Sequence, residues 1–323
     1  MVKISIAMKI SSKDHFEQME LTSSLLAELF GTTEDEINSY CASFIKDHDL
    51  SFSLLTGERK EQMILSSLKF LETDKQKIGE FNRVSVWQNG WQENLDNFKQ
   101  TRSLSSIIPK FIRPRQILRL NREFIETKDT YFELRFIELF HLWFFNKYLQ
   151  PYATVFEFGC GSGLNCVRLC DMFPNKLVVG CDFVDSSISL INTVADECKF
   201  NLKAKKFNML EPDYNLEVPP NSCAFTFGAI EQLAGNFQPF LSFLKHKRFA
   251  FCFHIEPTVE LYDEDNLIDF LAIKFHNQRG YTSGFLPYLQ KLHNSFNIDL
   301  KYKRMFFGNS RMEGYNYMLW SSL

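Results

Sequence analysis

The sequence predicts an α/β fold in which a Rossmann-like, doubly wound parallel sheet follows a mainly helical N-terminal region. From residue 153 onward, short apolar runs alternate with stretches of helical spacing, which is typical of a parallel sheet with helices on both faces. Before residue 150, apolar side chains recur mainly at helical intervals. We therefore expect a helical N-terminal or cap region at residues 1–128 and a core domain at residues 129–323.

Four helices are expected before residue 150, three in the N-terminal region and one at the start of the core domain, each marked by its spacing or by a capping residue. Residues 101–128 are expected to be irregular, because Pro109 and Pro114 interrupt any helix there. The helix that follows is apolar over most of its length and is expected to be capped by Asp129. The predicted helices start at residues 32–36 and 56–58 and cover residues 82–97 and 129–149.

The core domain is expected to contain five strands joined by helices. The apolar runs are too short for helices of their own and are bounded by glycine or polar residues, which favours buried strands. The predicted strands are residues 154–158, 176–181, 203–207, 224–228 and 249–254, and the clearest helices are residues 164–172 and 186–198.

The composition is that of a globular protein. Of 323 residues, 45% are hydrophobic and 23% are charged, which excludes a mainly disordered chain. The net charge of −3 provides no overall basic field, so a nucleic-acid partner is not favoured. The 34 Phe residues favour a Phe-rich core, and an aromatic-lined pocket is a second interpretation of the same excess.

Three features favour a cytoplasmic protein. The eight Cys residues form no CxxC pair and stand mostly in apolar runs, so we expect reduced, buried thiols. Residues 1–18 lack the apolar stretch and the cleavage site of a signal peptide. No apolar stretch reaches the roughly 18 residues of a transmembrane helix, so no membrane contact is expected.

The most informative motif begins at the end of the first predicted core strand. Glu157 is followed by Gly159, Gly161 and Gly163, and a predicted helix comes next. Glycines allow a tight turn and a close approach to a ligand, and a helix N-terminus offers free N–H groups. Asp182 ends the second predicted strand, where a carboxylate can accept hydrogen bonds from both hydroxyls of a ribose.

This constellation resembles motif I of the class I S-adenosylmethionine-dependent methyltransferases over about residues 150–320. The glycines follow a GxGxG pattern, whereas a dinucleotide-binding loop reads GxGxxG. The resemblance implies S-adenosyl-L-methionine as cofactor and S-adenosyl-L-homocysteine as product. A looser likeness, through residues 87–95, 108–114 and 254–257, is to bacterial methyltransferases found with surface-sugar biosynthesis.

The resemblance also implies roles for single residues around the glycine loop. Glu157 would anchor the loop or meet the amino group of the cofactor through water, and Gly159 and Gly161 would lie against its methionine moiety. Phe183 would pack on the adenine, although plain core packing is an equal alternative. Asn208 stands where the family usually has the Asp that contacts the adenine amine, and an Asn carbonyl can accept the same hydrogen bond.

Further residues follow the third and fourth predicted strands. Met209 is assigned to the cofactor with its neighbour Asn208. Glu231 and Gln232 lie in a loop that often reads Leu-Glu-His in small-molecule methyltransferases, so Glu231 is assigned to the cofactor and Gln232 to the substrate. Because Gln232 replaces the His, a general base is absent at that position.

Candidate catalytic residues are expected at the end of the fifth predicted strand. His254 and Glu256 alternate on one strand face, so both could point toward the methyl acceptor. His254 is the candidate general base and Glu256 its orienting partner, and a buried core histidine is the alternative. No metal is expected, because the acids at residues 256–265 are more typical of a solvated helix start.

Two segments are candidates for binding the acceptor. Residues 102–122 contain six Arg or Lys residues and no acid, so Arg113 could hold an anionic acceptor; a solvated or paired basic surface is the alternative that we favour slightly. Residues 275–281 are expected to form a lid that contributes Arg279 and Tyr281, with a plain surface loop as the alternative. Trp87 and Trp91 could stack on a sugar, but packing onto the core is favoured.

The sequence thus predicts methyl transfer from S-adenosylmethionine to a small polar acceptor, with an oxygen of a sugar or related metabolite as the first choice. One alternative is methylation of a nitrogen or of a protein. The other is a non-catalytic scaffold that binds the cofactor, which the changed residues at positions 208 and 232 leave open. An anionic acceptor and a homodimer also stay open, as does the identity of the acceptor atom.

Overall fold

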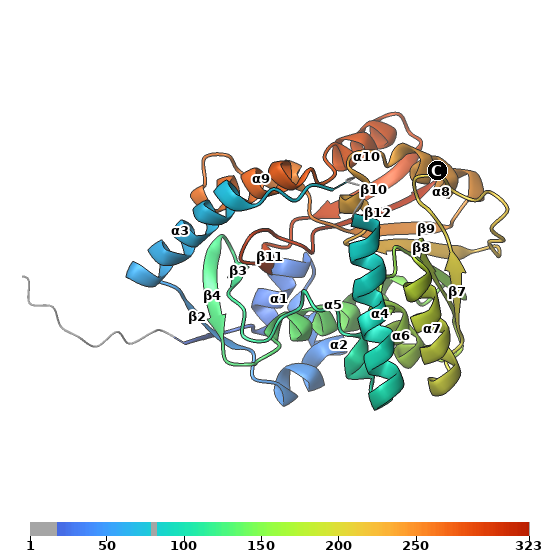
Figure 1. The fold of residues 1–323 in the computed structure, drawn as a ribbon, viewed down its shortest axis with the longest axis horizontal. Coiled ribbons are helices and arrows are strands. Elements are labelled where there is room, and N and C mark those ends of the chain that lie inside the picture. The colour runs from blue at the N-terminus through green and yellow to red at the C-terminus, as the bar shows by residue number, and fades with distance from the viewer. Residues whose placement is uncertain (1–17, 79–82, 323) are drawn as a thin grey trace, which may run out of the picture.

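A seven-stranded sheet forms the centre of the molecule in the computed structural model, which describes residues 18–78 and 83–322 (Figure 1). Five neighbouring strands, β5, β6, β7, β8 and β9, are parallel, and β12 and β10 extend the sheet beyond β9 as antiparallel strands. The predicted doubly wound parallel sheet is confirmed; the sequence pattern does not predict the two antiparallel strands. In spatial order the strands are β10 (Ile298–Lys303), β12 (Tyr317–Ser322), β9 (Phe251–Ile255), β8 (Ser222–Phe227), β5 (Thr154–Phe158), β6 (Leu177–Asp182) and β7 (Leu202–Lys206).

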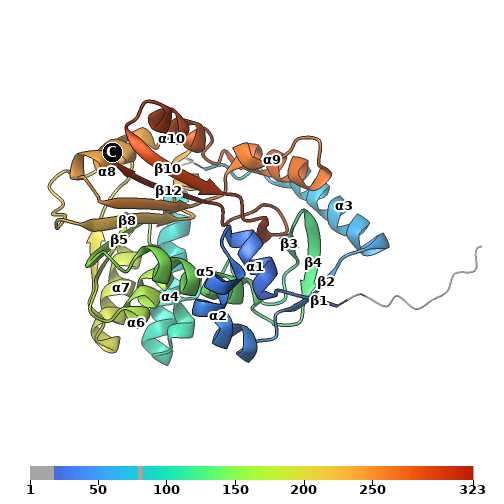
Figure 2. The ribbon, with the colours of Figure 1, turned by 180° about the vertical axis from the view of Figure 1, so that it is seen from behind.

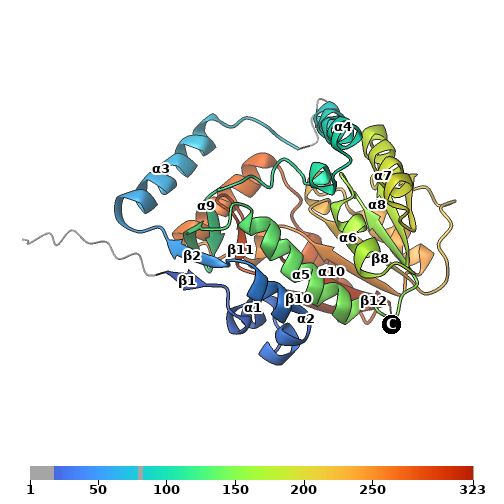
Figure 3. The same cartoon turned by 90° about the horizontal axis from the view of Figure 1, so that it is seen from below.

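Helices cover both faces of this sheet, as the alternating pattern predicts. Val155 of β5 packs on the face that carries α5, α6 and α7, whereas Phe156 and Phe158 pack on the face that carries α8 and α10. Figures 1 and 3 show α4 beside α7 on the first of these faces. The helices are α4 (Arg83–Thr101), α5 (Phe132–Tyr148), α6 (Leu164–Met172), α7 (Asp185–Cys198), α8 (Gln238–Lys247) and α10 (Phe285–Asn294).

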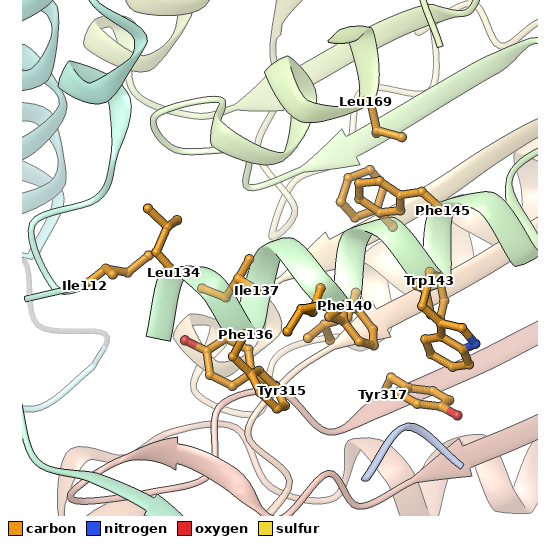
Figure 4. Close-up of a cluster of buried hydrophobic side chains, with 14 of the residues drawn as sticks. Ile112, Leu134, Phe136, Ile137, Phe140, Trp143, Phe145, Leu169, Tyr315 and Tyr317 are labelled. Carbon is orange, nitrogen blue, oxygen red and sulfur yellow. The ribbon is translucent and has the colours of Figure 1, made fainter. Parts of the chain in front are cut away.

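Helix α5 is buried around most of its circumference and contains five of the 34 Phe residues. Phe136, Phe140 and Phe144 contact rings from distant parts of the chain, among them Tyr315 and Tyr317 (Figure 4). The helix begins at Phe132, not at the predicted residue 129. Its predicted cap, Asp129, accepts a hydrogen bond from the Tyr131 N–H in the turn before the helix. The predicted Phe-rich core is confirmed.

A second, antiparallel sheet of five strands lies beside the main sheet (Figure 2). Its outer strands come from the two ends of the described chain, because β11 pairs with β3 and β1 pairs with β2. Strands from the N-terminal region and from the C-terminal residues therefore belong to one sheet, which joins chain segments on both sides of the boundary predicted at residue 128. In spatial order the strands are β1 (Met19–Glu20), β2 (Ser51–Leu54), β4 (Glu123–Thr127), β3 (Leu118–Leu120) and β11 (Phe307–Asn309).

The hairpin of β3 and β4 corrects the prediction that residues 101–128 are irregular. Leu120 pairs with Glu123, so the turn holds only Asn121 and Arg122, with φ angles of 49° and 65°. Two positive φ angles match a two-residue hairpin turn of type I′, for which Asn-Gly is the usual signal. Arg in the glycine position conceals that signal in the sequence.

The N-terminal helices follow their predicted caps. The Thr33 side chain accepts a hydrogen bond from the Glu36 N–H at the start of α2, and α3 begins directly after Thr56. The predicted start at Asn82 and the predicted absence of a signal peptide over residues 1–17 lie outside the described residues. The remaining helices are α1 (Ser23–Phe30), α2 (Glu34–Asp47), α3 (Gly57–Thr73), α9 (Leu267–Arg279) and the short η1 (Leu104–Ile107), η2 (Ile230–Leu233) and η3 (Val259–Leu261).

The cysteines and the helix lengths bear on two further predictions. All eight Cys residues are free thiols, and all but the half-buried Cys198 are buried, as predicted. Among residues 18–78 and 83–322, no helix has the length and apolar character needed to cross a membrane.

Candidate active site

A cavity of about 850 Å³ opens at the carboxyl ends of β5, β6 and β8. Strand β5 lies between β6 and β8, and the chain turns from one side of the sheet to the other at this point. Open α/β sheets bind ligands in the crevice at such a reversal of strand order. Of the predicted motif residues, Glu157, Gly159, Gly161 and Asp182 line this cavity, whereas Gly163 lies against Ile191 of α7 and does not line it.

The glycine loop is fixed by its backbone and by close neighbours. Gly159, Gly161 and Gly163 have φ angles of 73°, 53° and 79°, a region that favours glycine. A Cβ at Gly159 would lie 2.4 Å from Cβ of Ala229, and one at Gly161 would lie 2.7 Å from the Trp91 ring. Protein atoms thus make the closest approaches to the loop, so glycine is required there even before any ligand is considered.

Asp182 joins the end of β6 to the glycine loop. Its Oδ2 accepts a hydrogen bond of 2.8 Å from the Gly161 N–H, and its Oδ1 accepts one of 3.1 Å from the Val184 N–H. Burial raises the pKa of this carboxyl group, and the backbone donors oppose the rise. The side chain is held in one orientation at the cavity wall, with lone pairs left for a ligand that carries hydroxyl groups.

Glu157 anchors the helix that follows the glycine loop. Its carboxylate accepts hydrogen bonds from Nδ2 of Asn165 at 2.7 Å and from Sγ of Cys166 at 3.0 Å. Burial raises the pKa of Glu157 to about 7. Glu157 and Asn165 both line the cavity, so the carboxyl group lies within reach of a cationic ligand group there.

Three residues that the resemblance assigns to the cofactor, two of them to its adenine, line the same cavity. Phe183 is 40% exposed, which sets it apart from the buried Phe residues of the core. The Asn208 side-chain oxygen accepts a hydrogen bond from the Leu210 N–H, and Met209 lies near Gly159. Position and exposure therefore favour a binding surface at Phe183 over plain core packing.

The loop after β8 is held from beneath by Glu256. The Glu256 carboxylate accepts hydrogen bonds of 3.1–3.2 Å from the backbone N–H groups of Ala229, Ile230 and Glu231. Glu256 is 2% exposed and does not line the large cavity, whereas Glu231 and Gln232 do. Glu256 therefore supports the loop backbone; its predicted role beside a catalytic histidine is wrong.

His254 is also misplaced by the sequence prediction. Its side chain is fully buried and absent from the cavity wall. Nδ1 lies 2.9 Å from Oγ1 of Thr226, and Nε2 accepts a hydrogen bond of 3.0 Å from Nε1 of Trp320. Burial lowers the pKa of His254 to about 3. The alternative of a satisfied core histidine is correct, because the strand turns this face toward α10 and Phe285.

Sequence reasoning missed a buried carboxyl group that does face the cavity. Glu133, in the first turn of α5, accepts hydrogen bonds from the Tyr315 hydroxyl at 2.6 Å and from the Gln116 amide. All three residues line the cavity. Burial raises the pKa of Glu133 to about 7. The only sequence signal is an acid at the start of an apolar helix, which helix capping would equally explain.

Tyr315 connects this carboxyl group to the residues at the carboxyl end of β8. Its ring packs edge-on against Phe227, the last residue of β8, with 5.8 Å between ring centroids. The negative charges of Glu133 and Glu231 both raise the pKa of Tyr315, after burial, so both lie within electrostatic reach. The hydroxyl of Tyr315 thus contacts the first turn of α5 through Glu133 and lies within electrostatic reach of Glu231 in the loop after β8.

The basic segment at residues 102–122 does not act as one patch. Its charges are mainly paired or buried: Arg102 with Glu197, Lys110 with Glu93, Arg122 with Asp263 and Asp269, and Arg119 with the Ile268 carbonyl. Arg113 alone of its cationic residues lines the cavity. The paired-surface alternative therefore holds for most of the segment, with Arg113 as the exception.

The predicted lid at residues 275–281 is mostly helical. Helix α9 continues to Arg279, and Gly280 ends it with a φ of 67°. Arg279 and Tyr281 nevertheless line the cavity, as does Arg311, which the sequence prediction did not include. Trp87 and Trp91 are stacked at 5.7 Å between ring centroids and also line it, so α4 closes the cavity over the glycine loop.

These residues fit S-adenosylmethionine. The glycine cradle, the fixed carboxylate of Asp182 and the exposed Phe183 ring follow one another along the carboxyl ends of β5 and β6. Helix α6 begins at Gly163 without a side-chain cap, which leaves its first turn open to a polar ligand end. Within the described ranges, no group of three His, Cys, Asp or Glu side chains is arranged to hold a metal ion.

Comparisons with known proteins give distant structural matches only. No family model and no curated protein matches the chain. A structure described as PigF with SAH is 10% identical, covers 81% of this chain and 70% of that chain, and has a TM-score of 0.45. The methyltransferase domain of bacterial CtHen1-CN is 15% identical over 53% of this chain and 91% of that one, with a TM-score of 0.39. A SAM-dependent methyltransferase from Aquifex aeolicus is 15% identical over 54% and 85%, with a TM-score of 0.37.

Proposed function

We propose that this protein transfers a methyl group from S-adenosylmethionine to an oxygen of a small polar acceptor. The observation that carries the proposal is the single cavity wall shared by the glycine loop, Asp182, Phe183 and Glu133. A cavity of about 850 Å³ lies within the roughly 300–1,000 Å³ typical of small-molecule sites. Such a volume favours a metabolite over an open groove for a macromolecule.

The chain's own residues divide into two groups around the cofactor. Gly159, Gly161, Asp182 and Phe183 would hold it, with Glu157 facing its cationic end; Asn208, Met209 and Glu231 extend the same surface. When bound, S-adenosylmethionine supplies an activated methyl group on a sulfonium centre and leaves as S-adenosylhomocysteine. The protein then has to align the acceptor and keep water out, which the stacked Trp87 and Trp91 support.

Glu133 takes the role that the sequence analysis gave to His254. A hydroxyl acceptor loses its proton during methylation, and a carboxyl group with a pKa near 7 is suited to receive it. The Tyr315 hydroxyl and the Gln116 amide orient the Glu133 carboxylate by their hydrogen bonds. Gln232 and Tyr281 lie on the same cavity wall and would contact the acceptor.

Calorimetric titration with S-adenosylhomocysteine tests the cofactor assignment. Wild-type protein should bind it, and Asp182→Ala should weaken binding by about 1–3 kcal/mol, because the ribose hydroxyls lose a charged acceptor. Glu211→Ala, an exposed acid after β7, is the control and should bind as the wild type does. Unchanged affinity in Asp182→Ala would remove Asp182 from the site. No binding by the wild type would reject both the proposed methyl transfer and a scaffold that binds the cofactor.

A further inference from the structure

Arg279 of α9 and Arg311, which follows β11, both pack against the same two phenylalanine rings beside the cavity. The guanidinium carbon of Arg311 lies 3.5 Å from the ring centroid of Phe70 and 5.8 Å from that of Phe275. The guanidinium carbon of Arg279 lies 5.8 Å and 5.6 Å from the same two centroids. Two positive charges are therefore held close together by packing against the same rings.

A third arginine, Arg113, adds to this positive charge. Partial burial, and then repulsion from Arg279 and Arg113, lowers the pKa of Arg311, and the negative charge of Asp74 opposes this fall. Arg113, Arg279 and Arg311 all line the cavity, and they come from three separate parts of the chain. These three residues form the arginine cluster.

The arginine cluster has fewer negative partners than positive charges. Arg279 pairs with Asp74, with 2.7 Å between Nε and Oδ2, and its Nη1 donates a hydrogen bond to Gln76. Within residues 18–78 and 83–322, Arg113 and Arg311 form no ion pair. Arg113 and Arg311 are exposed at the cavity, and among the described residues Asp74 is the one carboxylate paired with the arginine cluster. The guanidinium N–H donors of Arg113 and Arg311 are therefore available to an anionic group that enters the cavity.

We infer that the arginine cluster binds an anionic group, a carboxylate or a phosphate, on the small acceptor of the proposed reaction. Guanidinium groups match both anions through paired N–H donors. The Phe70 and Phe275 rings hold the guanidinium groups of Arg279 and Arg311 in place. This inference rests on the proposed function, because it assigns the charge of the acceptor at that same site. It selects acidic or phosphorylated sugars over neutral ones.

The inference is tested by titrating three sugars into protein saturated with S-adenosylhomocysteine. Glucuronate carries a carboxylate, glucose 6-phosphate carries a phosphate, and glucose carries neither. At least one of the two anions should bind, glucose should bind at least about tenfold more weakly, and added salt should reduce the difference. The stronger of the two anions identifies the charged group.

Variants connect that binding to the arginine cluster. Arg311→Gln and Arg113→Gln should each weaken binding of the anionic sugar by about 10–100-fold, the loss expected for a charge-assisted hydrogen bond. Arg115→Gln is the matched control, since Arg115 is exposed in the same segment as Arg113 but does not line the cavity. A thermal melt of each variant verifies that it is folded.

Three outcomes would overturn the inference. The first is equal binding of glucose and the two anionic sugars, and the second is no binding of any of the three. The third is that a short RNA oligonucleotide binds and that Arg311→Gln weakens RNA binding but not sugar binding. A wild-type protein that does not bind S-adenosylhomocysteine is a different result, because it would reject the proposed function itself. Retained S-adenosylhomocysteine binding in Arg311→Gln shows that the cofactor site is intact.

Discussion

Glu133 shows how one buried side chain can be prepared for proton transfer. Its carboxyl group is 5% exposed and is held by two hydrogen-bond donors, Tyr315 and Gln116. Burial disfavours its charged form, and the two donors offset only part of that effect, so its pKa rises to about 7. A carboxyl group in this state can both release and accept a proton near neutral pH.

The raised pKa of Glu133 predicts a pH-dependent difference between the wild type and Glu133→Gln. Between about pH 4.5 and pH 7 the folded protein keeps a proton that the unfolded chain has released. The unfolding free energy of the wild type therefore falls as pH rises through this range, and the Gln variant lacks this contribution. We expect the Tm of the wild type minus that of Glu133→Gln to decrease steadily from pH 5 to pH 7.5.

Thermal melts of both proteins across this pH range measure the difference directly. Subtracting the two curves cancels the contributions of the other titrating groups, including the buried His254. Glu28→Gln, on the exposed surface of α1, serves as the control. A difference for Glu133→Gln that does not change with pH would contradict the raised pKa.

At the scale of an element, η2 depends on a carboxylate that lies beneath it. The residues of η2 offer backbone N–H groups that have no partner within a helix this short, and Glu256 accepts three hydrogen bonds from this loop. The same loop presents Glu231 and Gln232 to the cavity. Glu256 is therefore a positioning residue for the cavity wall.

Replacing Glu256 by Gln should loosen this loop. The amide group keeps one acceptor oxygen but turns N–H donors toward backbone donors, so at least one buried N–H loses its partner. We expect the unfolding free energy to fall by about 1–3 kcal/mol. Amide hydrogen exchange at residues 229–233 should also become faster. Glu264→Gln changes an exposed acid of the following segment and is the control; equal effects of the two substitutions would reject the role of Glu256.

At the scale of the whole molecule, a buried ionic cluster ties the two sheets together. Arg304 lies between β10 of the main sheet and β11 of the second sheet. It donates hydrogen bonds of 2.7–2.8 Å to Asp269 and Glu313, and a further one to the Leu261 carbonyl. Asp269 also pairs with Arg122 in the turn between β3 and β4. The segment that carries Arg311 and Tyr315 is anchored by this cluster.

Arg304→Met should destabilise the protein strongly. The substitution would leave the buried carboxylates of Asp269 and Glu313 without their main cation, which costs about 3–5 kcal/mol. Chemical denaturation measures the loss. Arg59→Met removes the exposed pair with Glu126 and should cost no more than about 1 kcal/mol. Similar losses for the two variants would show that the buried cluster does not tie the sheets together.

Local sequence patterns are enough to predict the five parallel strands of the main sheet and the glycine loop. Both depend on neighbours in the chain: apolar runs bounded by turn residues define the strands, and the acid, the GxGxG turn and Asp182 follow one another within two strand–helix units. The five parallel strands accordingly lie within two residues of their predicted positions, whereas these patterns do not predict the antiparallel β10 and β12. The position of these motif residues on one cavity wall follows from the same order, because carboxyl ends of parallel strands meet at one edge.

Packing between distant segments decides which side chains face the cavity. Glu133 and Tyr315 are 182 residues apart, and Phe70 meets Arg311 from the other end of the chain, so no local pattern brings them together. His254 has the right position on its strand, but α10 and Trp320 cover its face of the sheet. Sequence periodicity specifies that a strand has two faces; which face meets a cavity depends on packing between distant segments.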